Sequence, residues 1–149
     1  IWISGIGQKT TSASFTKNDL GEIQSTQIAA DLAYKMADIV PKDIDVAEVH
    51  DAFSVCELMA ISELGITSGE KSGEYVRNLF NTEDKIINPR GGLIGAGHPL
   101  GATGISQTIE IINQLQGKSG KRQINNAKIG LIHNMSAAGT SSSVMVMKN

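Results

Sequence analysis

Asn88-Pro-Arg-Gly-Gly-Leu-Ile-Gly-Ala-Gly-His-Pro-Leu-Gly-Ala-Thr-Gly104 is the most informative segment of this sequence. It contains six glycines and two prolines around one histidine, His98. Glycine allows unusual backbone angles and close approaches, whereas proline restricts φ, so the segment predicts an ordered loop rather than part of a packed core. Ordering such a loop costs conformational entropy, which indicates that the histidine has a function.

Apolar periodicity on both sides of this loop predicts strands that alternate with helices. Strands are predicted at residues 1–6, 45–50, 86–89, 128–133 and 142–147, and helices at 23–40, 51–63, 74–80 and 103–116. The first strand is expected to be short and buried, ended by Gly5 and Gly7. Asp51 or Ser54 is expected to cap the second helix. The order β-α-β-α-β-α-β-β predicts an α/β fold over residues 1–149, a mixed five-stranded sheet with helices packed on it.

Two helices carry apolar stripes, which predict the side that faces the sheet. In the helix over 23–40 the stripe comprises Ile28, Leu32, Met36 and Ile39. In the helix over 103–116 one stripe comprises Ile105, Ile109 and Ile112, with Thr108, Ile111 and Leu115 beside it.

Composition excludes several classes of protein. The single cysteine, Cys56, rules out internal disulfides and a cysteine metal cluster, and the net charge of −2 gives no sign of a nucleic-acid surface. We find no membrane-spanning run and no signal peptide, so a cytoplasmic location is expected. The chain begins Ile-Trp-Ile without methionine, which suggests a piece of a longer polypeptide.

All three histidines are expected at the carboxyl ends of strands, where an open sheet forms its ligand crevice. His50 ends the second predicted strand, His98 follows the third and His133 ends the fourth. A structural role is the simplest alternative for each. A three-histidine metal site is disfavoured because the spacings are long, and a phosphate loop is disfavoured because Gly-Lys-Ser/Thr is absent. Stabilisation of an oxyanion by a neutral imidazole N–H of His98 fits better.

Three motifs, in order, resemble those of thiolases. The segment 88–104 is similar to the thiolase histidine motif, and His50-Asp-Ala-Phe53 resembles the His-Asp-x-Phe segment of the archaeal and sterol-carrier-protein-x branch. His133-Asn134, followed by small residues to Gly139, resembles the last active-site loop of that branch. The resemblance covers essentially the whole chain and implies the C-terminal half of a thiolase.

This resemblance implies an acetyl-CoA acetyltransferase that moves acyl groups between coenzyme A thioesters, by 3-ketoacyl-CoA thiolysis or acetyl-CoA condensation, in lipid metabolism. The nucleophilic cysteine would lie in the N-terminal half, so this chain alone is expected to be inactive. Acyl-CoA would be a substrate, with no covalently bound cofactor and no metal. The expected partners are the N-terminal half and further copies in a dimer or tetramer.

By the same resemblance, His98 would help to activate the cysteine and would donate to the thioester oxygen, while His50 would organise a water or a second oxyanion contact. The backbone N–H near Met135, with Asn134 and Gly97 in the surrounding loops, would complete the oxyanion hole.

Two positions depart from the family pattern. His133 stands where most thiolases have a second, acid/base cysteine, and Ala52 stands where the sterol-carrier branch places it. Cys56 lies one helical turn further along, either as a displaced acid/base or as a small core residue. A proton relay contributes about 10²–10⁴-fold to rate. Its loss would leave a slow thiolase or an enzyme that uses His50 or His133 instead. The alternative function is a non-catalytic thiolase-like scaffold or lipid-binding subunit.

Overall fold

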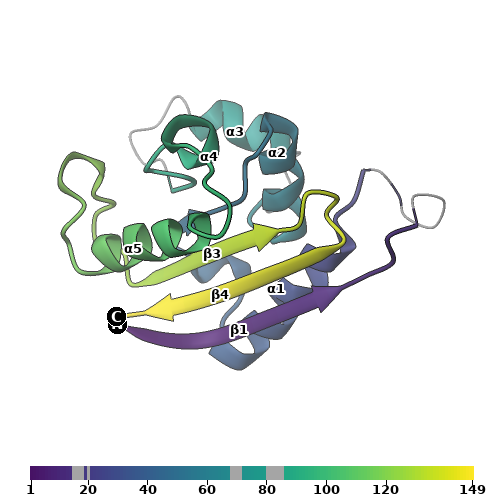
Figure 1. Cartoon of the computed structure of the whole chain (residues 1–149). Coiled ribbons are helices and arrows are strands. Elements are labelled where there is room, and N and C mark those ends of the chain that lie inside the picture. The colour runs from purple at the N-terminus through teal and green to yellow at the C-terminus, as the bar shows by residue number, and fades with distance from the viewer. Residues whose placement is uncertain (15–18, 20, 68–71, 80–85) are drawn as a thin grey trace.

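A computed structural model describes residues 1–14, 19, 21–67, 72–79 and 86–149. Among them, four strands form one mixed sheet in the order β1-β4-β3-β2 (Figure 1). The strands are β1 (Trp2–Thr10), β2 (Val46–Glu48), β3 (Ile129–Met135) and β4 (Ser141–Lys148). β4 pairs antiparallel with β1 and β3, whereas β2 pairs parallel to β3.

Helices cover both faces of this sheet. They are α1 (Gln24–Ala37), α2 (Ser54–Glu63), α3 (Ser72–Leu79), α4 (Gly92–Ala96) and α5 (Thr103–Leu115), with short 3₁₀ helices at Pro41–Asp43 and Gly120–Arg122. One core joins α1 and α2 to Leu131 and Val146 on one face, and the other joins Ile111 of α5 to Val46 and Ile132 on the opposite face (Figure 1). No helix in the described ranges is long and apolar enough to cross a bilayer.

The α/β class is confirmed, but the five-stranded sheet and its element order are wrong. The predicted strand at 86–89 pairs with β2 through a single parallel bridge, between Ile87 and Ala47. Asn88 then adopts a positive φ of 49°, and Pro89 has no N–H to extend the ladder. Helices α2 to α5 therefore follow one another between β2 and β3. The helix predicted at 74–80 corresponds to α3, and Phe80 lies outside the described residues.

The prediction of a short, buried first strand is also wrong. β1 is a nine-residue edge strand, with Trp2 75% exposed. Gly5 and Gly7 lie within it because the backbone of α1 comes so close. A Cβ on Gly7 would lie 1.8 Å from the carbonyl oxygen of Ala29. Glycine therefore permits the contact between β1 and α1 and does not end the strand.

The close approach of α1 also reverses its predicted orientation. Its buried positions are mostly small (Ser25, Thr26, Ala29, Ala30, Ala33, Tyr34 and Ala37). Of the predicted apolar face, Leu32 and Met36 are 47% and 65% exposed, Ile28 is half-buried, and Ile39, beyond the end of α1, packs against the core. Because the facing strand has bare glycine backbone, only small side chains fit between them.

Helix α5 buries its polar side. Ile105 and Ile109 of the predicted stripe are 64% and 54% exposed, whereas Gln107 and Glu110 are buried. The predicted neighbours Ile111 and Leu115 do face the core. On this polar side, Gln107 reaches Asn134 near the end of β3, where the candidate site is found, whereas Glu110 and Gln114 bond to residues 122–124 before β3.

Candidate active site

Two of the three histidines meet beyond the end of β2. The rings of His50 and His98 are perpendicular, at an interplanar angle of 89°, and their centroids are 4.9 Å apart. His50 comes two residues after β2, and His98 lies in the loop between α4 and α5. The glycine-rich loop thus brings His98 against the strand end that carries His50.

The hydrogen bonds of His98 fix which ring nitrogen faces outward. Nδ1 lies 2.7 Å from the Thr103 hydroxyl, which itself donates to the Pro99 carbonyl over 3.3 Å. A hydroxyl has a single proton, so Thr103 accepts from His98 and the ring carries its proton on Nδ1. With its proton on Nδ1, the ring presents the outward Nε2 as an acceptor. The sequence predicted a donor at this position, and Nε2 becomes one only after it takes up a proton.

His50 is held from two other elements. Its Nδ1 donates to Oδ1 of Asn134 over 3.1 Å, and the Asn134 amide donates to Oε1 of the buried Gln107 on α5. Burial lowers the pKa of His50, and the neighbouring His98 lowers it further, against the opposing effect of the Asn134 bond. The His50 ring is therefore kept neutral, with Nε2 as an acceptor.

His133 lies on the other face of the sheet, so the prediction that three histidines line one crevice is wrong. Successive side chains of a strand point to opposite faces. Asn134 faces α5 and the site, and its neighbour His133 faces α1, where Nε2 lies 2.9 Å from the Thr26 hydroxyl. His133 is fully buried, which lowers its pKa to about 3, with a smaller contribution from His50.

Asp51 anchors the loop that carries His98. Its carboxylate accepts from the N–H groups of Leu93 (2.6 Å) and Ile94 (3.5 Å) in the first turn of α4. Gly92 has a φ of 62°, and a Cβ there would lie 2.0 Å from Asp51 Oδ2. Asp51 was predicted to cap α2 and instead caps α4. The N-cap position of α2 is Phe53, which has no side-chain cap, and Ser54 is the first helical residue.

The first residues of the loop are tied to the strand beneath them. Asn88 accepts from the Val49 amide over 2.8 Å and donates to Glu57 over 3.1 Å. Arg90 lies 3.6 Å from the buried Glu48 carboxylate. Burial raises the pKa of Glu48 to about 7, and the charge of Arg90 opposes that rise. These contacts dock the glycine-rich segment on β2.

The backbone donors predicted for an oxyanion hole differ in availability. The Gly97 N–H is already bonded to the Leu93 carbonyl at 2.9 Å, so Gly97 serves the turn that ends α4. The Ser136 N–H points to β4, where it bonds Ser141 at 2.8 Å. Because successive N–H groups of an extended strand alternate in direction, the Met135 N–H points away from β4, to the side where β2 has already ended.

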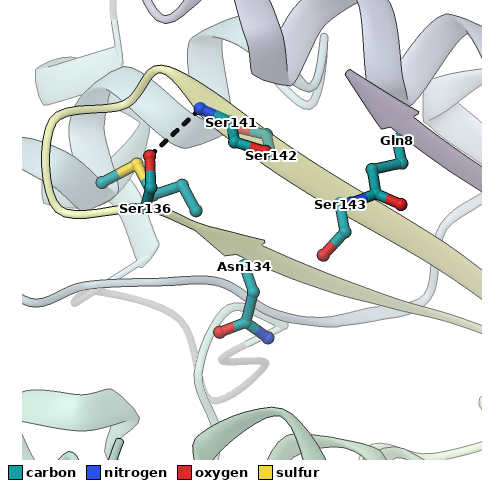
Figure 2. Close-up of a pocket in the computed structure, with 7 residues that line it drawn as sticks. Gln8, Asn134, Ser136, Ser141, Ser142 and Ser143 are labelled. Atoms are coloured by element: carbon teal, nitrogen blue, oxygen red, sulfur yellow. Dashed lines mark hydrogen bonds between the residues drawn. The ribbon is translucent and has the colours of Figure 1, made fainter. Parts of the chain in front are cut away.

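A shallow polar pocket opens beside this strand end (Figure 2). It is lined by Gln8, Asn134, Met135, Ser136, Ser141, Ser142 and Ser143. Gln8, Ser143 and Asn134 are paired across three neighbouring strands and form a polar row. Figure 2 shows Asn134 and Ser143 directed to the same side of the sheet. The row leads from the edge strand to Asn134 and thus to His50.

Cys56 lies in the first turn of α2 and is half-buried. Its Sγ makes no hydrogen bond with His50 or His98, all three being within the described part of the chain. Within those same ranges, no group of three histidine, cysteine or carboxylate side chains could hold a metal ion.

Thr103, Gln107 and Thr26 position the histidines, although the sequence motifs did not indicate them. Thr103 and Gln107 are one turn apart on α5, and with Glu110 and Gln114 they form a buried polar stripe. That spacing is visible in the sequence and could have indicated a helix whose polar side meets buried polar groups. Thr26 gave no comparable signal, because its partner His133 is far away in sequence.

A family model described as "Thiolase C-terminal domain-like" matches residues 7–149. The chain belongs to this thiolase family. It is 41% identical over 91% of its length to an acetyl-CoA acetyltransferase of Methanothermobacter thermautotrophicus, and 46% identical over 74% to sterol carrier protein 2 of Oryctolagus cuniculus. The archaeal and sterol-carrier resemblance of the motifs is thereby confirmed. The chain spans 36% and 21% of the lengths of these two relatives.

A solved structure titled "Ltp2-ChsH2(DUF35) aldolase" has the same thiolase-type fold. It superposes with a TM-score of 0.80 over 96% of this chain and 38% of its own, at 19% identity. At that identity the likeness concerns the fold.

Proposed function

We propose that this chain is the histidine-bearing half of an acyltransferase that moves acyl groups between coenzyme A thioesters. The observation that carries the proposal is the perpendicular pair of His50 and His98 at the end of β2, in a thiolase-family domain. The 41% identity to an acetyl-CoA acetyltransferase supports coenzyme A thioesters as the substrate class. The reacting cysteine is supplied by the N-terminal half.

His98 has the geometry of a base for a thiol. Its Nδ1 proton is held by Thr103, so the exposed Nε2 can accept the proton of a cysteine brought against it. The resulting thiolate attacks the acyl carbonyl carbon, forming a carbon–sulfur bond and placing negative charge on the carbonyl oxygen. Nε2–H of the imidazolium can then donate to that oxygen, as the sequence predicted for this histidine. When the adduct collapses, the bond between the acyl carbon and the coenzyme A sulfur breaks. That sulfur leaves as a thiol with the proton from Nε2, and the imidazole is again a base.

Two further groups are proposed to form the second oxyanion contact. The neutral His50 ring, with Nδ1 held by Asn134, directs Nε2 as an acceptor that can fix one water molecule. The Met135 N–H points past the end of β2 and would donate directly to an oxyanion. The acyl group finally leaves the cysteine by transfer to the thiol of coenzyme A, whose proton returns through the same imidazole.

Helix α5 indicates where the other half packs. A helix that buries its polar side and exposes Ile105 and Ile109 is unusual for a domain that stands alone. Leu100, two residues after His98, is 87% exposed. We propose that the cysteine-bearing half covers this apolar surface and thereby brings its thiol to His98. The assembled protein would form a dimer or a tetramer.

A non-catalytic scaffold or lipid-binding subunit is the second candidate. The observation that favours it is the lack of a second thiol at the site. Ala52 occupies one family position for that cysteine, and His133 occupies the other but is buried on the opposite face. The relatives named sterol carrier protein 2 make a lipid ligand the natural expectation for such a subunit.

Incubation of the full-length protein with radiolabelled acetyl-CoA separates the two candidates. An acyltransferase forms a covalent acetyl-cysteine, and added coenzyme A removes the label as acetyl-CoA. A Cys56→Ala variant should acquire the same label, because Cys56 is not the nucleophile. A full-length protein that acquires no label, yet binds acyl-CoA or lipid, would contradict the acyltransferase and support the scaffold.

A further inference from the structure

A buried hydrogen-bonded chain starts from the candidate site and continues on the opposite face of the sheet. His133 Nδ1 lies 3.5 Å from the His50 amide nitrogen, and His133 Nε2 lies 2.9 Å from the Thr26 hydroxyl. A backbone N–H can only donate, so Nδ1 bears the lone pair and Nε2 bears the proton. Thr26 therefore accepts from His133.

The other end of the chain requires the same order. Ser25 donates to the Gly139 carbonyl over 2.7 Å, and a carbonyl can only accept. Since a hydroxyl has one proton, Ser25 accepts from Ser142 (2.7 Å), and Ser142 accepts from Thr26 (2.9 Å). Thr26 then has only a lone pair left for His133. Because the His50 N–H can only donate and the Gly139 carbonyl can only accept, every hydrogen bond between them points in the same direction.

Every side chain in this hydrogen-bonded chain is buried. The exposed fraction is 0% for Ser25, Thr26 and His133, and 2% for Ser142. In such surroundings an unpaired polar group is costly, and a fully paired network holds its members in one arrangement. The ring of His133 stays neutral because burial lowers its pKa to about 3. It is therefore poorly suited to the acid/base role that its sequence position suggested.

We propose that His133 is a positioning residue, held as its Nε2–H tautomer by the chain through Thr26, that fixes the His50 backbone against the β3–β4 loop. The chain ties the end of β2 to Gly139 through the first turn of α1. It thereby positions both the backbone of His50 and the loop that follows Met135. The effect of this hydrogen-bonded chain on catalysis rests on the proposed function, whereas the placement of its protons does not.

The tautomer can be read directly. In full-length protein labelled with ¹⁵N-histidine, long-range ¹H–¹⁵N correlation spectra show which ring nitrogen carries the proton. We expect His133 to be neutral and protonated on Nε2 throughout the range of about pH 5 to 8 in which an ordinary histidine changes charge. A proton on Nδ1, or a charged ring within that range, would overturn the proposal.

Paired variants distinguish positioning from mere stabilisation. Thr26→Val removes the hydroxyl at nearly constant volume, and Thr26→Ser keeps it. We expect Thr26→Val to shift the amide resonance of His50 and to lower kcat by about tenfold with little change in KM, because misplaced catalytic groups lose rate. Thr26→Ser should restore both. Ser119→Ala removes a buried serine hydroxyl that does not belong to this hydrogen-bonded chain. It should change neither the His50 resonance nor kcat.

The outcomes separate this proposal from the acyltransferase itself. An unshifted His50 amide in a destabilised Thr26→Val protein would show that the chain only stabilises the fold, and would overturn the positioning role. If the wild-type protein had no acyl transfer, the proposed function would fail, while the tautomer and the His50 resonance would still decide the proposal about His133.

Discussion

The carboxylate of Asp51 occupies the space that a side chain on Gly92 would need. A Cβ built on Gly92 would lie 2.0 Å from Asp51 Oδ2. The same carboxylate accepts from the Leu93 amide at 2.6 Å, so the first turn of α4 is held against Asp51. The identity of Gly92 is thereby explained by the cap that holds the loop of His98.

Two alanine substitutions in α4 should therefore have opposite effects. Gly92→Ala combines a positive φ with a clash against Asp51, and we expect a loss of about 1–3 kcal/mol in the free energy of unfolding. Gly95→Ala lies in the same helix with no atom within 4 Å of its Cβ, and it should stabilise by up to about 1 kcal/mol. Chemical denaturation measures both. Equal effects would contradict the assigned role of Asp51.

The close contact between β1 and α1 gives a second expectation. In Gly7→Ala the new methyl group would meet the Ala29 carbonyl at 1.8 Å, so the helix must move away from the sheet. We expect a loss of about 2–3 kcal/mol in the free energy of unfolding, as for an overpacked core. Lys9→Ala on the exposed part of the same strand is the matched control. A Gly7→Ala protein as stable as this control would refute the contact.

Buried Glu48 should make stability depend on pH. Its pKa in the folded protein is about 7, against an ordinary value of 4.5, so the folded state binds the additional proton between those values. Stability from this source is present below pH 4.5 and is lost as pH rises through 7.

Glu48→Gln keeps the shape of the side chain and removes the titration. Denaturation midpoints measured across this pH range should therefore shift in favour of the variant as pH rises. Glu74→Gln, at an exposed glutamate on α3, should run parallel to the wild-type protein. A difference between Glu48→Gln and wild type that is constant with pH would show that Glu48 does not titrate as proposed.

The local signals in the sequence predicted the elements well, because glycine, proline and apolar period act over short distances. The loop around His98, helix α5 and the strands β3 and β4 were all predicted within a few residues of their observed positions. These features depend on neighbouring residues alone.

Several of the errors concern which side of an element is buried. Leu32 faces outward because Gly7, on a strand distant in sequence, leaves room only for alanine. The residue pattern of α1 by itself does not reveal this contact. Ile105 faces outward because the polar side of α5 meets Asn134. The misplacement of His133 was avoidable, since residues 133 and 134 of one strand must face opposite sides.

The rate of acyl transfer by full-length protein with His98→Ala tests the central claim most directly. We expect kcat to fall by about 10²–10⁴-fold, since the thiol base and the oxyanion donor are lost together. Thr103→Val, which only frees Nδ1 of the ring, should lower kcat by a smaller factor. Undiminished turnover of coenzyme A thioesters by His98→Ala would contradict the account.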